Sequence, residues 1–300
     1  MIWIFRKEKI VLKDRIITGI SKDKSIRFFA VDATETVKKG IEIHQLFQPD
    51  SIILGRLLIA AIMMGIDLKS DKDRITLKIE SDGPIGGALV TSDKNGNVKG
   101  YVNKPGAAAS KGIIGIKDAI GNGVLTIIKD LGLKHPYIGT VKLIYGTIAR
   151  DLTYYFVKSE QIPTSISLGV LIDEHGNIRQ AGGFMVQLLP ETKEEIISKV
   201  EKNIRSFPNL TDMMDMGYSI EKVINDFILK DLSPEIKRTV PVRYYCDCSK
   251  EKFARGLKLL GKEELEEALE KGEKLEIVCH FCRKKYIYGE NDILEILNEL

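Results

Sequence analysis

The segment from Ser51 to Leu68 reads SIILGRLLIAAIMMGIDL and decides the fold of the first part of the chain. Its apolar residues lie nearly all round a helix. Such a helix is stable only where other elements bury it on every side, so we expect it at the centre of a domain. The longest uncharged apolar run of the chain, Leu57 to Ile66, lies within it and is far shorter than the roughly 20 residues of a membrane span.

Around this helix, the sequence predicts an α+β core domain over residues 1–190. Apolar and polar residues alternate over 15–18 and 25–31, as in a half-buried hairpin. The other predicted elements are a helix over 35–47, strands over 74–81, 88–91 and 98–102, and a hairpin of 170–172 with 178–188.

The pattern changes near Pro190, and we interpret residues 191–238 as a helical linker. Apolar residues recur at helical spacing over 191–207 and again over 219–229. These short amphipathic helices are too small to form a core of their own, so their apolar faces must rest on other parts of the protein. We expect the C-terminal domain to hold them down in part.

The four cysteines of the chain, Cys246, Cys248, Cys279 and Cys282, all lie in the last 55 residues. Each pair follows a predicted strand, at 242–245 and at 275–278. A helical insert with a charged run over 262–274 lies between the pairs, and we expect a strand near 286–288 and a terminal helix after them. Four thiolates at such spacing are typical of a closed tetrahedral zinc site, although one residue between the first two is fewer than usual. Residues 239–300 therefore predict a small domain that one zinc ion stabilises, since about 60 residues bury little surface.

The same spacing leaves two roles open for the cysteines. One is a permanent zinc staple, as in most modules with four cysteines. The other is a redox switch, because zinc-bound sulfur is the nucleophilic thiolate and a disulfide between close cysteines is strained and readily reduced. His280 lies between Cys279 and Cys282, but four cysteines already saturate the ion, so we do not expect His280 to be a ligand.

The C-terminal sequence resembles the 33 kDa chaperonin family of redox-regulated heat-shock holdases. The resemblance rests on Cys-Asp-Cys-Ser at 246–249, Cys-His-Phe-Cys at 279–282 and the TVPVR motif at 239–243. It extends to the front of the chain, in FAVDAT at 29–34 and IESDGPIGG at 79–87. The order of these motifs, the length and the mass of 33.6 kDa match the family over essentially the whole chain.

The resemblance implies an ATP-independent chaperone that is inactive while reduced and zinc-bound. It implies that oxidation releases the zinc and forms two disulfides, Cys246 with Cys248 and Cys279 with Cys282. It further implies binding of unfolded client proteins, a homodimer in the active form and a cytoplasmic location. Met213, Met214 and Met216 in the linker suit an adaptable client surface, although methionines at helical spacing are more often ordinary core.

Two other functions remain as alternatives. A zinc ribbon for nucleic acid is disfavoured because residues 239–300 carry more acidic than basic side chains. A thiol-disulfide oxidoreductase using Cys279 and Cys282 lacks the βαβ setting of that class. The composition, 44% hydrophobic and 29% charged, is that of a globular protein.

No enzyme or membrane protein is predicted. The histidines are scattered, the glycine-rich stretches at 83–87 and 121–123 lack a nucleotide-binding pattern and suit turns, and we find no catalytic residue. The N-terminal Met1 to Phe5 places apolar residues before basic ones, the reverse of a secretory signal, which favours the cytoplasm.

Overall fold

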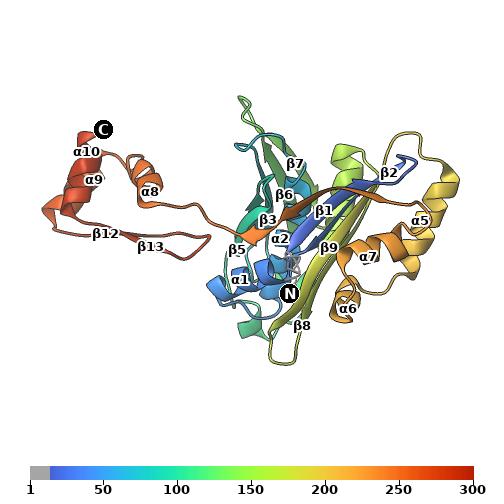
Figure 1. Cartoon of the computed structure of the whole chain (residues 1–300). Helices are drawn as coiled ribbons and strands as arrows, with labels where there is room; N and C mark the ends of the chain where they lie inside the picture. The colour runs from blue at the N-terminus through green and yellow to red at the C-terminus, as the bar shows by residue number, and fades with distance from the viewer. Residues whose placement is uncertain (1–13) are drawn as a thin grey trace, which may run out of the picture. The chain divides into compact units, whose positions relative to one another are not determined.

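A computed structural model describes residues 14–300 of the chain (Figure 1). Met1 to Phe5 therefore lies outside the described residues. The chain divides into two compact units that meet between Tyr244 and Tyr245. No helix among residues 14–300 has the length and apolar character that a membrane span requires.

The first unit contains two β-sheets. A five-stranded antiparallel sheet, called sheet A, has the order β10 (Glu235–Pro241), β1 (Arg15–Ile20), β2 (Ile26–Asp32), β9 (Ile178–Leu188), β8 (Thr164–Ile172). A six-stranded sheet, called sheet B, has the order β11 (Arg243–Tyr244), β5 (Asn97–Val102), β4 (Ala88–Ser92), β3 (Arg74–Ser81), β6 (Gly123–Asp130), β7 (Tyr137–Lys142). Its strands are antiparallel except that β11 is parallel to β5.

Helix α2 (Asp50–Gly65) contacts strands of both sheets, as Figure 1 shows. Only Ile52 and Arg56 of its residues are not buried. The predicted central helix is thus confirmed, and its all-round apolar surface is explained by a sheet on either side. Helix α1 (Thr34–His44) precedes it and ends three residues earlier than the sequence predicts.

The predicted hairpins of the core are confirmed, but several elements were not predicted. Strands β1 and β2, β4 and β5, and β8 and β9 pair as expected. The sequence patterns that we used did not predict β6, β7, the first half of β8, or the helices α3 (Ile116–Ile120) and α4 (Ala149–Tyr155). Burial alternates along the edge strand β7 from Ile138 to Lys142, but the exposed Ile138 is apolar, so apolar and polar residue types do not alternate in its sequence.

The glycine-rich segments form turns, as predicted. Gly121 has φ of +73°, a conformation that glycine adopts without strain. A Cβ atom at Gly121 would lie only 2.4 Å from Oδ1 of Asp82. Asp82 in turn accepts a hydrogen bond of 2.7 Å from the backbone N–H of Asn122, so the carboxylate joins the two turns.

A buried carboxylate organises the start of α4. Asp151 is fully buried and accepts hydrogen bonds from the backbone N–H groups of Ile144, Tyr145, Thr147 and Ile148, at 2.9 to 3.1 Å. Ile148 has φ of +66°, which is strained for a β-branched residue. The four hydrogen bonds to Asp151 hold the backbone in this conformation.

The linker helices lie on the face of sheet A that points away from α2 (Figure 1). They are α5 (Glu194–Ser206), α6 (Leu210–Asp215) and α7 (Ile220–Val223), which continues as a π-helical turn over Ile224–Ile228. Their buried residues pack with Ile17, Ile26, Phe28, Phe184 and Val186 of the sheet. The sheet therefore supplies the cover that we expected in part from the C-terminal domain, because both faces of β2 and β9 are apolar.

Two ion pairs and an aromatic cluster accompany this docking. Arg15 on β1 donates to both carboxylate oxygens of Glu221 on α7, at 2.8 and 2.7 Å. Arg179 on β9 pairs with Asp215 at the end of α6 at 2.5 Å. The rings of Phe184, Phe207, Phe227 and Tyr218 follow one another edge to face.

The end of the linker and the segment after it differ from the expectation. Residues 235–241 form β10 on the edge of sheet A, so the last four residues of the predicted helical linker 191–238 belong to a strand that pairs with β1. Arg243 and Tyr244 pair with β5 of sheet B. The predicted strand at 242–245 thus belongs to the first unit rather than to the small C-terminal domain. Its hydrogen bonds go to β5 because the chain passes from the edge of one sheet to the edge of the other.

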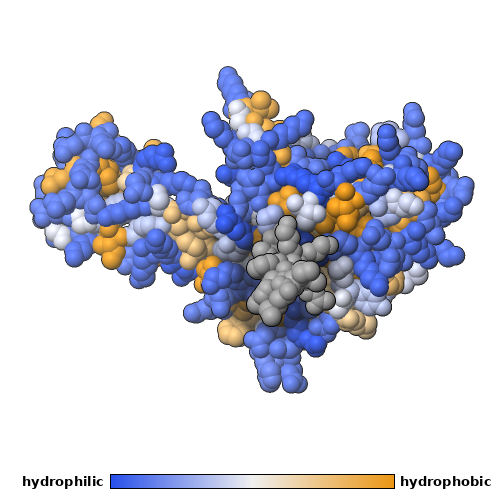
Figure 2. Space-filling model, viewed as in Figure 1, coloured by the Kyte–Doolittle hydropathy of each residue, from blue (hydrophilic) through white to orange (hydrophobic). Residues whose placement is uncertain are grey.

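The second unit, residues 245–300, has the elements predicted for it. Helices α8 (Lys250–Leu257) and α9 (Lys262–Glu270) precede the hairpin of β12 (Leu275–Val278) and β13 (Lys285–Tyr288), and α10 (Glu290–Asn298) follows. Figure 2 shows that the visible face of each unit is mostly hydrophilic, with hydrophobic residues in separate patches.

Candidate metal centre

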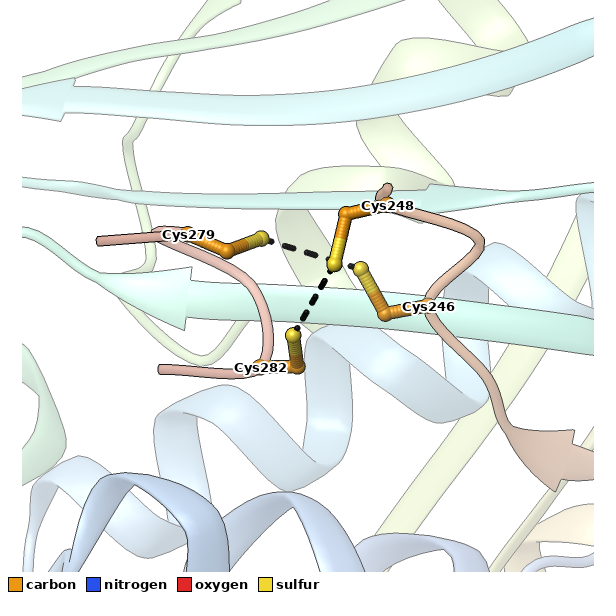
Figure 3. A group of neighbouring side chains, drawn as sticks. All are labelled: Cys246, Cys248, Cys279 and Cys282. Carbon is orange, nitrogen blue, oxygen red and sulfur yellow. Dashed lines mark hydrogen bonds between the residues drawn. The ribbon is translucent and has the colours of Figure 1, made fainter. Parts of the chain in front are cut away.

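The four cysteines come together in the second unit, with their sulfur atoms pointing toward one another (Figure 3). Cys246 and Cys248 lie in the loop before α8. Cys279 and Cys282 lie in the turn between β12 and β13. The sequence predicts these four residues as one group, and the geometry brings all of them to one point.

The sulfur positions fit a single tetrahedral metal ion. All four sulfur atoms lie within 4.8 Å of one another. The separations include 3.7 Å between Cys246 and Cys279 and 3.3 Å between Cys248 and Cys282. Zinc–sulfur bonds of about 2.3 Å in a tetrahedron place the sulfurs about 3.8 Å apart. This donor set suits a soft divalent ion such as zinc better than calcium or magnesium, which prefer oxygen.

A tight backbone turn aims the second pair of sulfurs. The N–H of Cys279 donates to the carbonyl of Lys284 at 2.9 Å, and the N–H of Arg283 donates to the carbonyl of Cys279 at 2.8 Å. Arg283 adopts φ of +61°, which closes the turn. On the other side, Ser249 caps α8 by accepting a hydrogen bond from the N–H of Lys252. Both loops are therefore set by local hydrogen bonds.

Tyr286 contacts the cluster and was not predicted. Its hydroxyl donates to the carbonyl of Cys248 at 3.0 Å and lies 3.2 Å from the Cys248 sulfur. Tyr286 follows Cys282 by four residues on β13, but a tyrosine in a short strand is common, so nothing in the sequence marked it as part of the site. It joins the first cysteine pair to the hairpin that carries the second.

Neighbouring groups change the acidity of two thiols in opposite directions. Partial burial acts to raise the pKa of Cys248, but hydrogen bonds to its sulfur from Tyr286 and from the other cysteines outweigh this and lower the pKa to about 7. For Cys282, burial raises the pKa to about 11, and its contact with Cys248 adds to the rise. Without a metal ion, the cluster thus holds negative charge preferentially at Cys248.

The rest of the unit packs around the sulfurs. Cys279 is 2% exposed and belongs to a buried cluster with Leu265, Tyr288 and Ile293. His280 is exposed at the surface of the turn. The sulfurs are therefore part of the small hydrophobic core of the second unit.

Comparison with known proteins identifies the family. The family model described as Hsp33 protein matches residues 14–289. The chain belongs to the Hsp33 family. The fold supports this, since a crystal structure of the 33 kDa chaperonin (heat shock protein 33 homolog) from Thermotoga maritima superposes with a TM-score of 0.85 at 36% identity. The match covers 96% of this chain and 98% of that one.

Curated relatives agree with this assignment to the Hsp33 family. The 33 kDa chaperonin of Thermoanaerobacter sp. (strain X514) is 41% identical over 95% of this chain and 98% of its own length. That of Clostridioides difficile (strain 630) is 40% identical over 96% of this chain and its whole length. The resemblance to the 33 kDa chaperonin family that the sequence showed is therefore confirmed.

Proposed function

We propose that this protein is a redox-regulated holdase that works without ATP in the cytoplasm. In the reduced form Cys246, Cys248, Cys279 and Cys282 hold one zinc ion, and the protein is inactive. In the oxidised form the zinc is released, apolar surface is exposed and unfolded client proteins are kept from aggregating. The gathering of four sulfurs within 4.8 Å, in a unit with a small core, is the observation that carries this proposal.

Zinc, when bound, supplies four bonds that join two loops far apart in sequence. The protein side of the switch is the oxidation of the thiols. In each disulfide, two thiols give up two protons and two electrons, and one hydrogen peroxide accepts them and becomes two waters. A disulfide sulfur is a poor zinc ligand, so oxidation of both pairs removes the whole donor set. The unit then loses the crosslinks on which its fold depends.

We assign the disulfides to Cys246 with Cys248 and to Cys279 with Cys282. Sulfur contacts of 3.7 and 3.3 Å run across the pairs, from Cys246 to Cys279 and from Cys248 to Cys282. Pairing across would keep the two loops crosslinked after zinc loss, whereas pairing within each loop leaves them free. Only the second pairing turns oxidation into an unfolding signal, which supports this assignment.

Release of the linker is the step that exposes apolar surface. The linker residues 191–238 cover Phe28, Phe184 and other apolar residues of sheet A. Strand β10 begins within this segment and ends at Pro241, five residues before Cys246. Unfolding of the second unit therefore begins next to this strand, and undocking would expose two apolar faces at once. Met213 and Met214 are buried there, which supports their role as docked core in the reduced form, while Met216 is 73% exposed.

The decisive experiment follows thiols, zinc and chaperone activity in the same samples. Peroxide treatment with mild warming should remove four thiols and one zinc per chain in parallel, and the product should suppress aggregation of a thermally unfolding client. The reduced, zinc-bound protein should not suppress it. Zinc retained after full oxidation, or equal activity in both forms, would reject the proposal. Sedimentation of the same samples tests the expected homodimer of the active form.

Trypsin distinguishes the two disulfide pairings directly. Cleavage after Arg243 and Lys250 places Cys246 and Cys248 in one peptide, and cleavage after Lys274 and Arg283 places Cys279 and Cys282 in another. The proposed pairing gives two separate peptides, each lighter by two hydrogens. A single crosslinked pair of peptides would contradict it.

A further inference from the structure

A cavity of about 560 Å³ opens in the first unit beside the C-terminal end of α2. Its floor is formed by Met63, Met64, Phe156 and Met185, none of which is more than 8% exposed. Three methionines in one floor are notable because the chain has only seven. Thioether side chains are flexible and polarisable, so such a floor adapts to apolar groups of different shape.

The rim of the cavity is polar and balanced in charge. Arg27 pairs with Asp67 at 3.0 Å, and Lys129 pairs with Glu160 at 2.5 Å. Asp73 accepts hydrogen bonds from the backbone N–H groups at 69 and 70, and Lys69 and Asp73 are both among the residues that line the cavity. The lining thus contains three cationic and three carboxylate residues, so it offers both hydrogen-bond donors and hydrogen-bond acceptors. These residues are Arg27, Lys69, Lys129, Asp67, Asp73 and Glu160.

We propose that this cavity binds a large apolar side chain of an extended client polypeptide, whose backbone is hydrogen-bonded by the rim. Its volume lies in the range of small-ligand sites, which is ample for a leucine or an aromatic side chain. A peptide backbone presents donors and acceptors alternately and carries no net charge. The balanced rim fits it, whereas a nucleotide or a fatty acid would meet as many carboxylates as cations.

The surface next to the cavity extends the site along a strand edge. Leu131 and Leu133, which line the cavity, are 41% and 70% exposed and lie in the turn between β6 and β7. Tyr137 and Ile138 follow at the start of β7 and are 46% and 58% exposed. Hydrophobic surface is visible near the tip of this hairpin in Figure 2.

Strand β7 also has an open edge. In the described part of the chain it is the terminal strand of sheet B and pairs with β6 alone. Such an edge can hydrogen-bond an extended segment of another chain. A client segment can therefore place one side chain in the cavity while neighbouring residues follow the hairpin.

This site is formed independently of the redox switch. Every residue that lines the cavity lies between Arg27 and Gln187, so none comes from the linker or from the second unit, residues 245–300, which we call the metal module. The expected gain comes mainly from burial of a single apolar side chain. Binding in the reduced form should therefore be weak, with a dissociation constant in the low millimolar range. The inference rests on the proposed client binding and adds a preformed contact to it.

Methionine methyl NMR on the reduced, zinc-loaded full chain tests the proposal. The probe is the peptide acetyl-Ser-Leu-Phe-Ser-amide, with acetyl-Ser-Ser-Gly-Ser-amide as control. The methyl signals of Met63, Met64 and Met185 should shift with the first peptide and not with the second. Those of Met213, Met214 and Met216 should stay in place and serve as internal controls. Unchanged signals from the three cavity methionines at millimolar peptide would overturn the proposal.

A matched pair of surface variants locates the effect. Leu133→Glu places a charge on the lip of the cavity, and we expect it to weaken peptide binding about tenfold. Ile114→Glu changes a residue that is 81% exposed and does not line the cavity, so binding should stay as in the parent protein. Equal effects of the two variants would contradict the assignment.

Decanoate, a fatty acid, is the competing probe. If decanoate shifts the cavity methionines and the apolar peptide does not, the site is one for amphiphilic anions and the proposal is wrong. The outcome is separable from that of the switch. Loss of redox control would leave the methyl shifts intact, and absence of the shifts would leave the thiol, zinc and aggregation measurements unchanged.

Discussion

The first unit and the metal module hold their folds by different means. In the first unit, α2 is buried between two sheets, and a second apolar cluster lies under the linker. In the module, the buried cluster has eight members, and one of them is the cysteine Cys279. A large core tolerates the loss of one contact, whereas we expect a core of this size to depend on the crosslink that a bound zinc ion would supply. We therefore expect the fold of the C-terminal metal module to be sensitive to loss of a metal ligand, and the fold of the first unit to be insensitive to it.

The largest effect is expected from a change of one metal ligand. Cys282→Ser should unfold the module while the first unit stays folded, because structural zinc contributes on the order of 10–16 kcal/mol in small modules. NMR spectra should lose the dispersed signals of 245–300 and keep those of the first unit. Ser249→Ala is the control, since it removes only the cap of α8 and costs about 1 kcal/mol. A module that stays folded in Cys282→Ser would break the comparison.

A smaller loss of stability is expected from a single substitution in the first unit. Asp151→Asn replaces a buried carboxylate that accepts four backbone N–H groups by an amide with one acceptor oxygen. We expect the free energy of unfolding of the first unit to fall by about 3 kcal/mol. Urea denaturation measures this fall. Asp130→Asn, at an exposed position, should leave the midpoint nearly unchanged, and an equal loss in both variants would argue against the special role of Asp151.

The ion pair between Arg15 of sheet A and Glu221 of the linker tests how firmly the linker is docked on the first unit. Glu221→Gln should weaken linker docking by about 1.5–3 kcal/mol, because Arg15 and Glu221 form two charged hydrogen bonds and are 15% and 29% exposed. Hydrogen exchange of the amides of α7 should then be faster. Glu195→Gln, which affects an exposed pair on α5, should not change exchange in α7.

The same pair predicts a dependence on pH. Partial burial acts to raise the pKa of Glu221. The hydrogen bonds and positive charge of Arg15, together with hydrogen bonds from the Glu221 backbone and from Ser219, outweigh burial, so the pKa lies below its ordinary value of 4.5. A lowered pKa in the folded state means that the pair stabilises docking above pH 4.5. The contribution is lost as the pH falls from there through the lowered pKa. The difference in α7 exchange between parent and Glu221→Gln should therefore shrink in that range, and a constant difference would contradict the assignment.

The smallest effect is expected from a helix cap in the linker. Ser219 accepts a hydrogen bond from the N–H of Lys222 at the start of α7. Ser219→Ala should weaken docking of α7 by about 1 kcal/mol. Ser198→Ala, on the exposed side of α5, should have no such cost. Hydrogen exchange separates the two, and similar exchange in α7 for both variants would show that the cap is not needed.

Periodicity predicted the parts of the fold whose burial is regular. The all-round apolar pattern at 51–68 predicted α2, and amphipathic patterns predicted α5 and the helix at 219–229. Strand β7 was not predicted because its exposed Tyr137 and Ile138 break the alternation of apolar and polar residues. The partner of the linker also could not be read from the sequence, because a strand such as β9, apolar on both faces, does not indicate what covers its second face.

The metal centre was predictable because its chemistry is carried by one residue type. Four cysteines close to the C-terminus left few other groupings, and all four meet. Tyr286 was not predictable, since its role depends on where its hydroxyl lies after β12 and β13 have paired. The cavity beside α2 likewise depends on tertiary structure, because its methionines come from α2 and β9, more than a hundred residues apart.

The pairing of β10 with β1 has a consequence for how the switch turns off. The helical part of the linker is attached to sheet A at both ends, because it follows Leu188 of β9 and precedes Glu235 of β10. While both strands remain paired, an undocked linker is a tethered loop and not a free tail. Its apolar face stays at an effective concentration of about millimolar relative to its own site. In the proposed mechanism, a bound client would therefore compete with an intramolecular ligand, and recapture of the linker would provide a built-in route for client release without an external energy source.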